Sequence, residues 1–278
     1  MKIRGWHQYR NPRLEAFLTF LIVYVGSLSL APSSTDQQVF LRSTLLQLGL
    51  VFGMPYLVDR LLAVNLRNDF RWQATSLRNL VFSFLVALSL IVLLETLISL
   101  EVQLFGSLRE HQSSVAALLK LYRLSELGWT LLAIGLVPAF CEEILFRGFI
   151  FSRFLRPGHT AEAIMLSSIL FGLFHRQLDM LFNNTLAGVV LALVVYRSGS
   201  LLNSILVHAI VNSGSIVLAN WADISPAIST ESSGLWTWFS LGASLLGTLI
   251  GLKGLRLTGS QTAISGDPLS GPNIDPPS

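Results

Sequence analysis

The sequence has one cysteine and few charged residues, and both shortages limit what the protein can be. Cys141 has no second cysteine to pair with, which excludes an internal disulfide and a cysteine-based metal site, so we interpret it as a packing residue. Charged residues make up 13% of the 278 residues, whereas soluble proteins contain about a quarter. Because 52% of the residues are hydrophobic, the composition predicts a multi-pass membrane protein in contact with the lipid bilayer.

The basic residues are spread along the chain. There are 19 lysines and arginines and the formal net charge is +3, but these residues lie between apolar stretches rather than in one cluster. This pattern is not that of a nucleic-acid-binding protein. With the N-terminus in the cytoplasm, most of them fall on the cytoplasmic side, as the positive-inside rule requires, and we expect both termini there. Those on the other side would be Arg42, Arg109, Lys120, Arg123 and Arg176.

Eight apolar stretches are long enough to cross or nearly cross a bilayer, which takes about 17–25 residues per helix. They predict an all-α fold, a polytopic transmembrane bundle of about eight helices. The stretches are 14–31, 43–58, 80–100, 127–154, 161–180, 181–196, 200–219 and 235–252. We expect one membrane domain over 1–257, followed by a disordered tail over 258–278 that is rich in Gly, Pro and Ser.

The interior of the fourth stretch, residues 131–151, carries three charged residues, Glu142, Glu143 and Arg147. Each such group near the bilayer centre is unfavourable by about 2.5–3.5 kcal/mol, so the group is expected to pair or to have a function. Glu143 and Arg147 are four residues apart on a helix, with the glutamate first, which favours an ion pair. Glu142 then remains free to act as a base. Pro138, one turn before it, is expected to kink the helix.

Two later stretches carry histidines that can reach the same depth as Glu142. Glu142 lies 16 residues before Gly158 and His175 lies 17 residues after it, so a hairpin at Pro157-Gly158 would bring the two side chains level. His208 and Asn212 are one helical turn apart and lie nine and thirteen residues after Gly199, deep in the seventh stretch. We therefore predict that side chains of three helices meet in one site.

In this order the motifs Glu142-Glu143-x-x-x-Arg147, Phe171-x-x-x-His175 and His208-x-x-x-Asn212 resemble those of the CAAX-protease and bacteriocin-processing (Abi) family of intramembrane proteases. The resemblance covers about 129–219. It implies hydrolysis of a peptide bond of a protein or peptide substrate, in or near the membrane. It also implies roles: Glu142 and His175 hold and deprotonate a water, Glu143 and Arg147 orient that pair, and His208 and Asn212 stabilise the oxyanion.

Zinc remains an alternative at this point. Glu142, His175 and His208 are ligand types that catalytic zinc accepts, and the family is often described as one of metalloproteases. The sequence has no His-Glu-x-x-His motif or other spacing that requires a metal. No cofactor is certain from the residues, and we prefer the metal-free scheme.

Two other classes of function are possible. Buried carboxylates and histidines also form ion paths in transporters, but transporters commonly contain internal repeats, which this sequence lacks. A family member without catalysis, acting as a scaffold or immunity factor, is expected to have lost Glu142, His175 or His208, and all three are present. Gly247-x-x-x-Gly251 in the last stretch is interpreted as a packing motif within the chain.

Overall fold

The computed structural model describes residues 11–29, 44–62, 71–105, 127–224 and 234–257. These residues form helices and connecting turns, with no strand among them, so the predicted all-α fold is confirmed. The predicted tail, 258–278, lies outside the described residues, as do four of the five basic positions that we placed on the non-cytoplasmic side.

Eight helical segments follow one another in the described residues, at the positions of the eight predicted stretches. They are α1 (Pro12–Ser29), η2 with α3 (Gln47–Phe52 and Gly53–Leu62), α5 (Leu77–Phe105), the continuous segment from α7 to α9 (Leu127–Phe154), α10 (Thr160–Phe174), α11 (Leu181–Ser198), α12 (Leu201–Ile224) and α13 (Gly234–Gly254). A short helical turn, η6 (Leu178–Met180), precedes α11.

Five of these segments are long and apolar enough to cross a membrane, as far as length and composition decide it: α5, α7 to α9, η6 with α11, α12 and α13. Thr44–Val58 and Thr160–Phe174 are shorter apolar helices. The chain is an integral membrane protein.

The predicted end of the fifth stretch, 161–180, was wrong, because α10 stops at Phe174 and Arg176 has a φ of 58°. A residue in this left-handed conformation cannot continue a right-handed helix.

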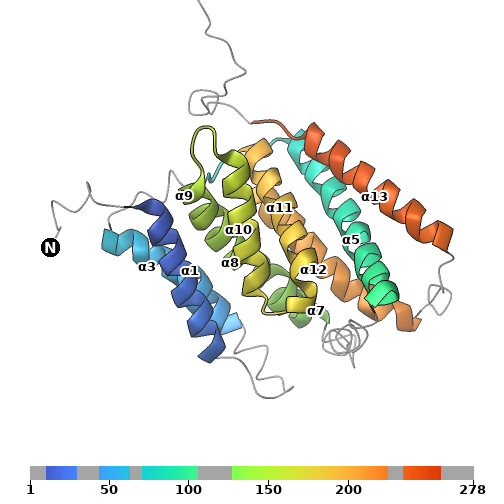
Figure 1. Ribbon diagram of the computed structural model, residues 1–278, viewed down its shortest axis with the longest axis horizontal. Coiled ribbons are helices and arrows are strands. Elements are labelled where there is room, and N and C mark those ends of the chain that lie inside the picture. The colour runs from blue at the N-terminus through green and yellow to red at the C-terminus, as the bar shows by residue number, and fades with distance from the viewer. Residues whose placement is uncertain (1–10, 30–43, 63–70, 106–126, 225–233, 258–278) are drawn as a thin grey trace, which may run out of the picture.

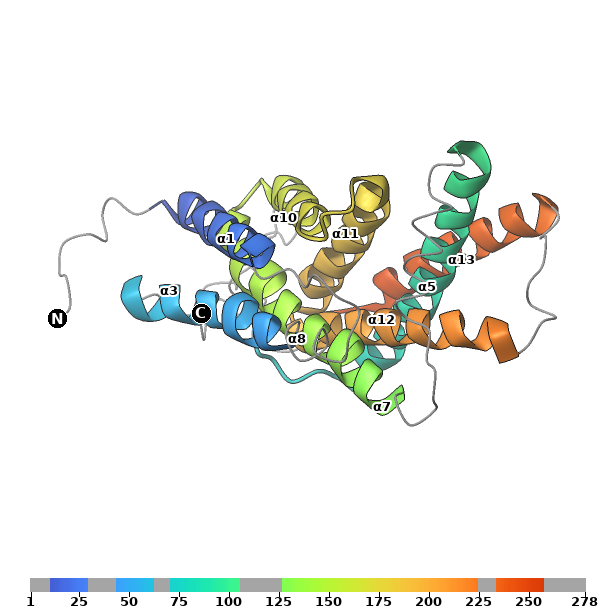
Figure 2. The ribbon, with the colours of Figure 1, turned by 90° about the horizontal axis from the view of Figure 1, so that it is seen from below.

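The helices lie side by side in one bundle (Figures 1 and 2). The first two helices, α1 and α3, form one flank, and α5 with α13 form the other. The segments α8, α10, α11 and α12 lie between the two flanks. The predicted site residues lie on the continuous segment from α7 to α9, just after the end of α10 and on α12. The turn at Pro157-Gly158 joins the first of these segments to α10, with Gly158 at a φ of 77°.

Glycines let α13 pack closely on α5. A Cβ atom added to Gly247 would meet the Ser89 side chain, and one added to Gly251 would lie 3.2 Å from the backbone oxygen of Phe82 and from the backbone nitrogen of Val86. These neighbours belong to α5 of the same chain, so the interpretation of Gly247-x-x-x-Gly251 as an internal packing motif is confirmed.

Gly251→Ala should therefore destabilise the protein by about 1–3 kcal/mol, the usual range for an overpacked interface. Gly242 on the same helix provides the control, because no heavy atom lies within 4 Å of a Cβ added there. Gly242→Ala should be neutral or stabilising by up to about 1 kcal/mol, since alanine favours a helix over glycine. Thermal unfolding of both variants in detergent measures the difference, and equal melting temperatures would contradict the close contact.

Candidate active site

The two glutamates lie on a short α-helical stretch, α8 (Val137–Glu143), between two π-helical segments, η4 (Leu131–Leu136) and η5 (Ile144–Phe151). π-Helical turns are rare and occur frequently at functional sites. Sequence reasoning predicted a proline kink here, and the structure has a π segment just before Pro138. Every residue from Cys141 to Phe151 is buried, so the charged groups face other helices rather than lipid.

Glu143 and Arg147 form the predicted ion pair. Arg147 Nη1 donates to Glu143 Oε1 at 2.6 Å, and the two side chains are 1% and 0% exposed. Arg147 Nη2 donates to the backbone oxygen of Gly188 at 3.1 Å, and the guanidinium lies 4.3 Å from the centre of the Phe171 ring. Both charges are thus compensated inside the bundle, which is the condition under which buried charges are tolerated.

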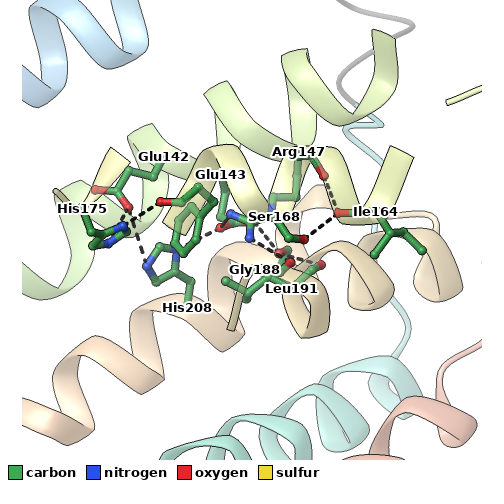
Figure 3. Close-up of polar contacts among 12 residues, drawn as sticks. Glu142, Glu143, Arg147, Ile164, Ser168, His175, Gly188, Leu191 and His208 are labelled. Atoms are coloured by element: carbon green, nitrogen blue, oxygen red, sulfur yellow. Dashed lines mark hydrogen bonds and ion pairs between the residues drawn. The ribbon is translucent and has the colours of Figure 1, made fainter. Parts of the chain in front are cut away.

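Glu143 is also joined to α12. His208 Nδ1 lies 2.9 Å from Glu143 Oε1, and the hydroxyl of Ser204 donates to Oε2 of the same carboxylate. Because an ionised carboxylate only accepts, His208 carries a proton on Nδ1 and directs Nε2 away from Glu143. The resemblance implied that Glu143 and Arg147 orient Glu142 and His175, whereas in the structure their contacts lead to His208 (Figure 3).

Glu142 faces both histidines. Its Oε2 lies 3.9 Å from Nε2 of His175 and 3.9 Å from Nε2 of His208 (Figure 3). The predicted depth match between Glu142 and His175 is therefore confirmed. His175 donates from Nδ1 to the backbone oxygen of Phe171 at 2.9 Å, because a carbonyl only accepts, and this contact leaves its Nε2 directed at Glu142. The His175 side chain is 29% exposed, so the cluster is reachable from outside the bundle.

Asn212 lies one turn beyond His208 and is half-buried. Its contact is with α7 to α9 rather than with the glutamates, since Nδ2 lies 3.5 Å from the backbone oxygen of Ile134. Pro138 has no N–H and cannot donate to this oxygen four residues back, as the corresponding residue of a regular α-helix would. The structure thus brings five of the six predicted side chains into one cluster and places Asn212 beside it.

Sequence reasoning missed two polar neighbours of the glutamates. Ser204 lies one turn before His208 on α12, and the regular spacing of 204, 208 and 212 on one helix face was a signal that could have found it. Gln47, in the second helix, donates from Nε2 to Glu142 Oε1 at 3.0 Å. A single glutamine in an otherwise apolar helix was the only sign of this residue.

The donor atoms of Glu142, His175 and His208 are spaced more widely than the ligands of a regular tetrahedral zinc ion. Zinc ligands lie about 2.0–2.2 Å from the ion, which puts neighbouring donor atoms about 3.4 Å apart. Glu142 Oε2 is 3.9 Å from both Nε2 atoms, and the part of the chain that the structure describes contains no group of three His, Cys, Asp or Glu that could hold a metal ion.

Comparison with known proteins agrees with the three motifs. Residues 124–214 match the sequence model of a family described as type II CAAX prenyl endopeptidase Rce1-like. This segment includes all six predicted site residues and leaves Gln47 outside. Searches of curated proteins and of solved structures found no match to the chain.

Proposed function

We propose that this chain, whose residues 124–214 match the type II CAAX prenyl endopeptidase family, is an intramembrane endopeptidase in which Glu142 and His175 activate a water without a metal. One observation carries the proposal. A single carboxylate oxygen, Glu142 Oε2, faces the Nε2 atoms of two histidines at 3.9 Å. This separation is too long for a direct hydrogen bond and suits two groups that share a water at about 2.8 Å from each.

In the proposed reaction Glu142 is the general base. Its Oε2 takes one proton from the water while the water oxygen bonds to the carbonyl carbon of the scissile peptide. His175 Nε2, unprotonated in the neutral ring, accepts a hydrogen bond from the other O–H of the water and orients it; this hydrogen stays on the water oxygen. The tetrahedral intermediate collapses when the peptide C–N bond breaks and the proton held by Glu142 passes to the leaving nitrogen.

The oxyanion requires donors, and we assign them to His208 and Asn212. His208 can donate from Nε2 when its ring is protonated, and the Glu143 carboxylate at 2.9 Å from Nδ1 stabilises that imidazolium, as the aspartate does in serine-protease triads. Arg147 and Ser204 hold Glu143 in place. The amide of Asn212 has two hydrogens, so its contact with Ile134 leaves one for the oxyanion.

Asn212→Ala should lower kcat by about 10²–10³-fold, the usual effect of removing one oxyanion donor. KM should hardly change, because such a donor acts mainly on the transition state. Steady-state cleavage by Asn212→Ala and by Asn220→Ala, a substitution two turns farther along α12, gives the comparison. An unchanged kcat, or a loss confined to KM, would remove Asn212 from the oxyanion site.

Cleavage of peptides by the purified protein in detergent tests the function itself. The panel contains prenylated and unprenylated CAAX-type peptides and unrelated membrane peptides, each incubated with and without a chelator in metal-free buffer. We expect products from at least one class, and equal rates with chelator. No cleavage of any peptide would contradict the endopeptidase. Stoichiometric zinc in the active protein, lost together with activity in His175→Ala, would replace the metal-free scheme by a zinc-dependent one.

The orientation proposed for the chain puts both termini in the cytoplasm. The turn between α9 and α10, the start of α5 and the end of α13 lie at one edge of the bundle, the upper edge in Figure 1. Basic residues flank the helix ends at this edge, and they are Arg71, Arg78, Arg156, Arg197, Lys253 and Arg256. This distribution supports the positive-inside assignment. Protease digestion of residues 258–278 in sealed vesicles of known orientation tests it, since cleavage from the non-cytoplasmic side alone would reverse the assignment.

A further inference from the structure

Gln47 is a polar residue on the packed face of an apolar helix. It begins η2 and lies one turn before Val51, which is fully buried. Its neighbours in the segment are apolar, Gln47-Leu-Gly-Leu-Val-Phe52, so the helix packs without needing a polar group at this position. A buried amide in a membrane helix is unfavourable unless it has a partner. Gln47 therefore needs an explanation that packing does not give.

Its partner is the proposed base. Gln47 Nε2 donates to Glu142 Oε1 at 3.0 Å, while the other carboxylate oxygen, Oε2, faces His175 and His208. The position of the amide is set by the contact between η2 and α8, where the rings of Phe52 and Phe140 lie 5.9 Å apart. The two oxygens of Glu142 are thus distinguished, because one is hydrogen-bonded to a neighbouring helix and the other is directed into the cluster.

The other end of the amide is unsatisfied. Gln47 Oε1 is buried and has no hydrogen-bond partner among the described residues. A glutamine that only joined two helices would be expected to satisfy its oxygen as well, since an unpaired buried acceptor is unfavourable. Turning the amide over would place Oε1 against the Glu142 carboxylate, where two acceptors repel. The observed orientation therefore favours the contact with Glu142 at the expense of the amide's own oxygen.

We propose that Gln47 is a positioning residue of the active site, which holds Glu142 Oε1 so that Oε2 is the oxygen that takes the proton from water. The inference rests on the proposed function. It adds a residue from the second helix, outside the segment 124–214, to a site otherwise built from that segment. A carboxylate without this contact can rotate, and a misplaced base slows proton transfer without affecting how the peptide binds.

The test replaces Gln47 with methionine, which has a similar length and no donor. Gln47→Met should lower kcat by roughly 10- to 100-fold, the effect expected for the loss of one hydrogen bond to a charged group, and KM should not change. The melting temperature in detergent should change little, because the lost hydrogen bond to Glu142 Oε1 is offset by the removal of the unpaired buried oxygen of Gln47. Gln47→Glu, which places an acceptor against Glu142, should lower kcat further.

Leu50→Met, one turn along the same helix, is the matched control. Leu50 packs beside Gly26 of α1, so the variant alters packing in η2 without changing a polar contact to Glu142. It should keep the wild-type kcat. A wild-type kcat for Gln47→Met, or losses of kcat that follow losses of melting temperature in both methionine variants, would overturn the positioning role.

Glu142→Gln, measured in parallel, separates this inference from the proposed function. If Glu142→Gln is inactive and Gln47→Met is fully active, only the role of Gln47 is wrong. If folded Glu142→Gln remains active, Glu142 is not the base, and the role of Gln47 is wrong with it.

Discussion

Glu142→Gln is expected to lower kcat by about 10⁴-fold, the upper end of the contribution of a general base, while the protein stays folded. Glutamine has the size of glutamate and can accept the hydrogen bond from Gln47 Nε2, but its amide cannot take a proton from water. The variant should stay folded because the buried ion pair of the site is formed by Glu143 and Arg147, which are joined to each other and not to Glu142. Steady-state or single-turnover cleavage in detergent, together with thermal unfolding, measures both properties.

Glu162→Gln is a suitable control for this experiment. Glu162 lies on α10 and pairs with Arg13 at 2.8 Å, with its side chain 39% exposed, so it is a carboxylate remote from the cluster. Its replacement should leave kcat within about twofold, because exposed ion pairs contribute little. Turnover by folded Glu142→Gln at a rate close to that of the control would exclude Glu142 as the base.

The parts of the site that follow from local geometry could be predicted from the sequence. Helical periodicity places Glu143 and Arg147 on one face at a separation of four residues, and the ion pair at 2.6 Å follows. Counting residues on both sides of Gly158 predicted that Glu142 and His175 lie at one depth, because consecutive antiparallel helices rise equally from their turn. Both predictions concern residues that are close in the sequence or lie on two helices joined by a single turn.

The contacts between distant helices could not be obtained in this way. The hydrogen bond from Gln47 to Glu142 joins residues that are 95 positions apart, and it depends on which helices are neighbours in the bundle. The choice between His175 and His208 as the partner of Glu143 depends on the rotation of the helix that carries the glutamates. Two π segments, Leu131–Leu136 and Ile144–Phe151, change that rotation relative to a regular helix. Hydrophobic periodicity does not reveal such segments. The sequence therefore predicted Asn212 in the cluster, whereas its amide lies beside the backbone oxygen of Ile134.

Arg147→Ala should destabilise the protein by about 3–5 kcal/mol, the effect of leaving one member of a buried ion pair without its partner. Glu143 is 0% exposed and would keep only the contacts from His208 and Ser204. The substitution also removes the donor to the Gly188 oxygen and the cation over the Phe171 ring. Folded yield, thermal unfolding and denaturant titration in detergent should all show the loss, and kcat should fall because Glu143, without Arg147, is no longer fixed in the position from which it holds His208.

The double variant Glu143→Gln/Arg147→Met separates the two effects. The double variant leaves no unpaired charge, which is the cause of the loss in Arg147→Ala, so it should recover most of the stability that Arg147→Ala loses. Its kcat should stay low, because the glutamine that replaces Glu143 is neutral and cannot stabilise a His208 imidazolium. Arg147→Ala as stable as wild type would show that the pair does not hold the bundle together, and full activity of the double variant would show that Glu143 does not act through His208.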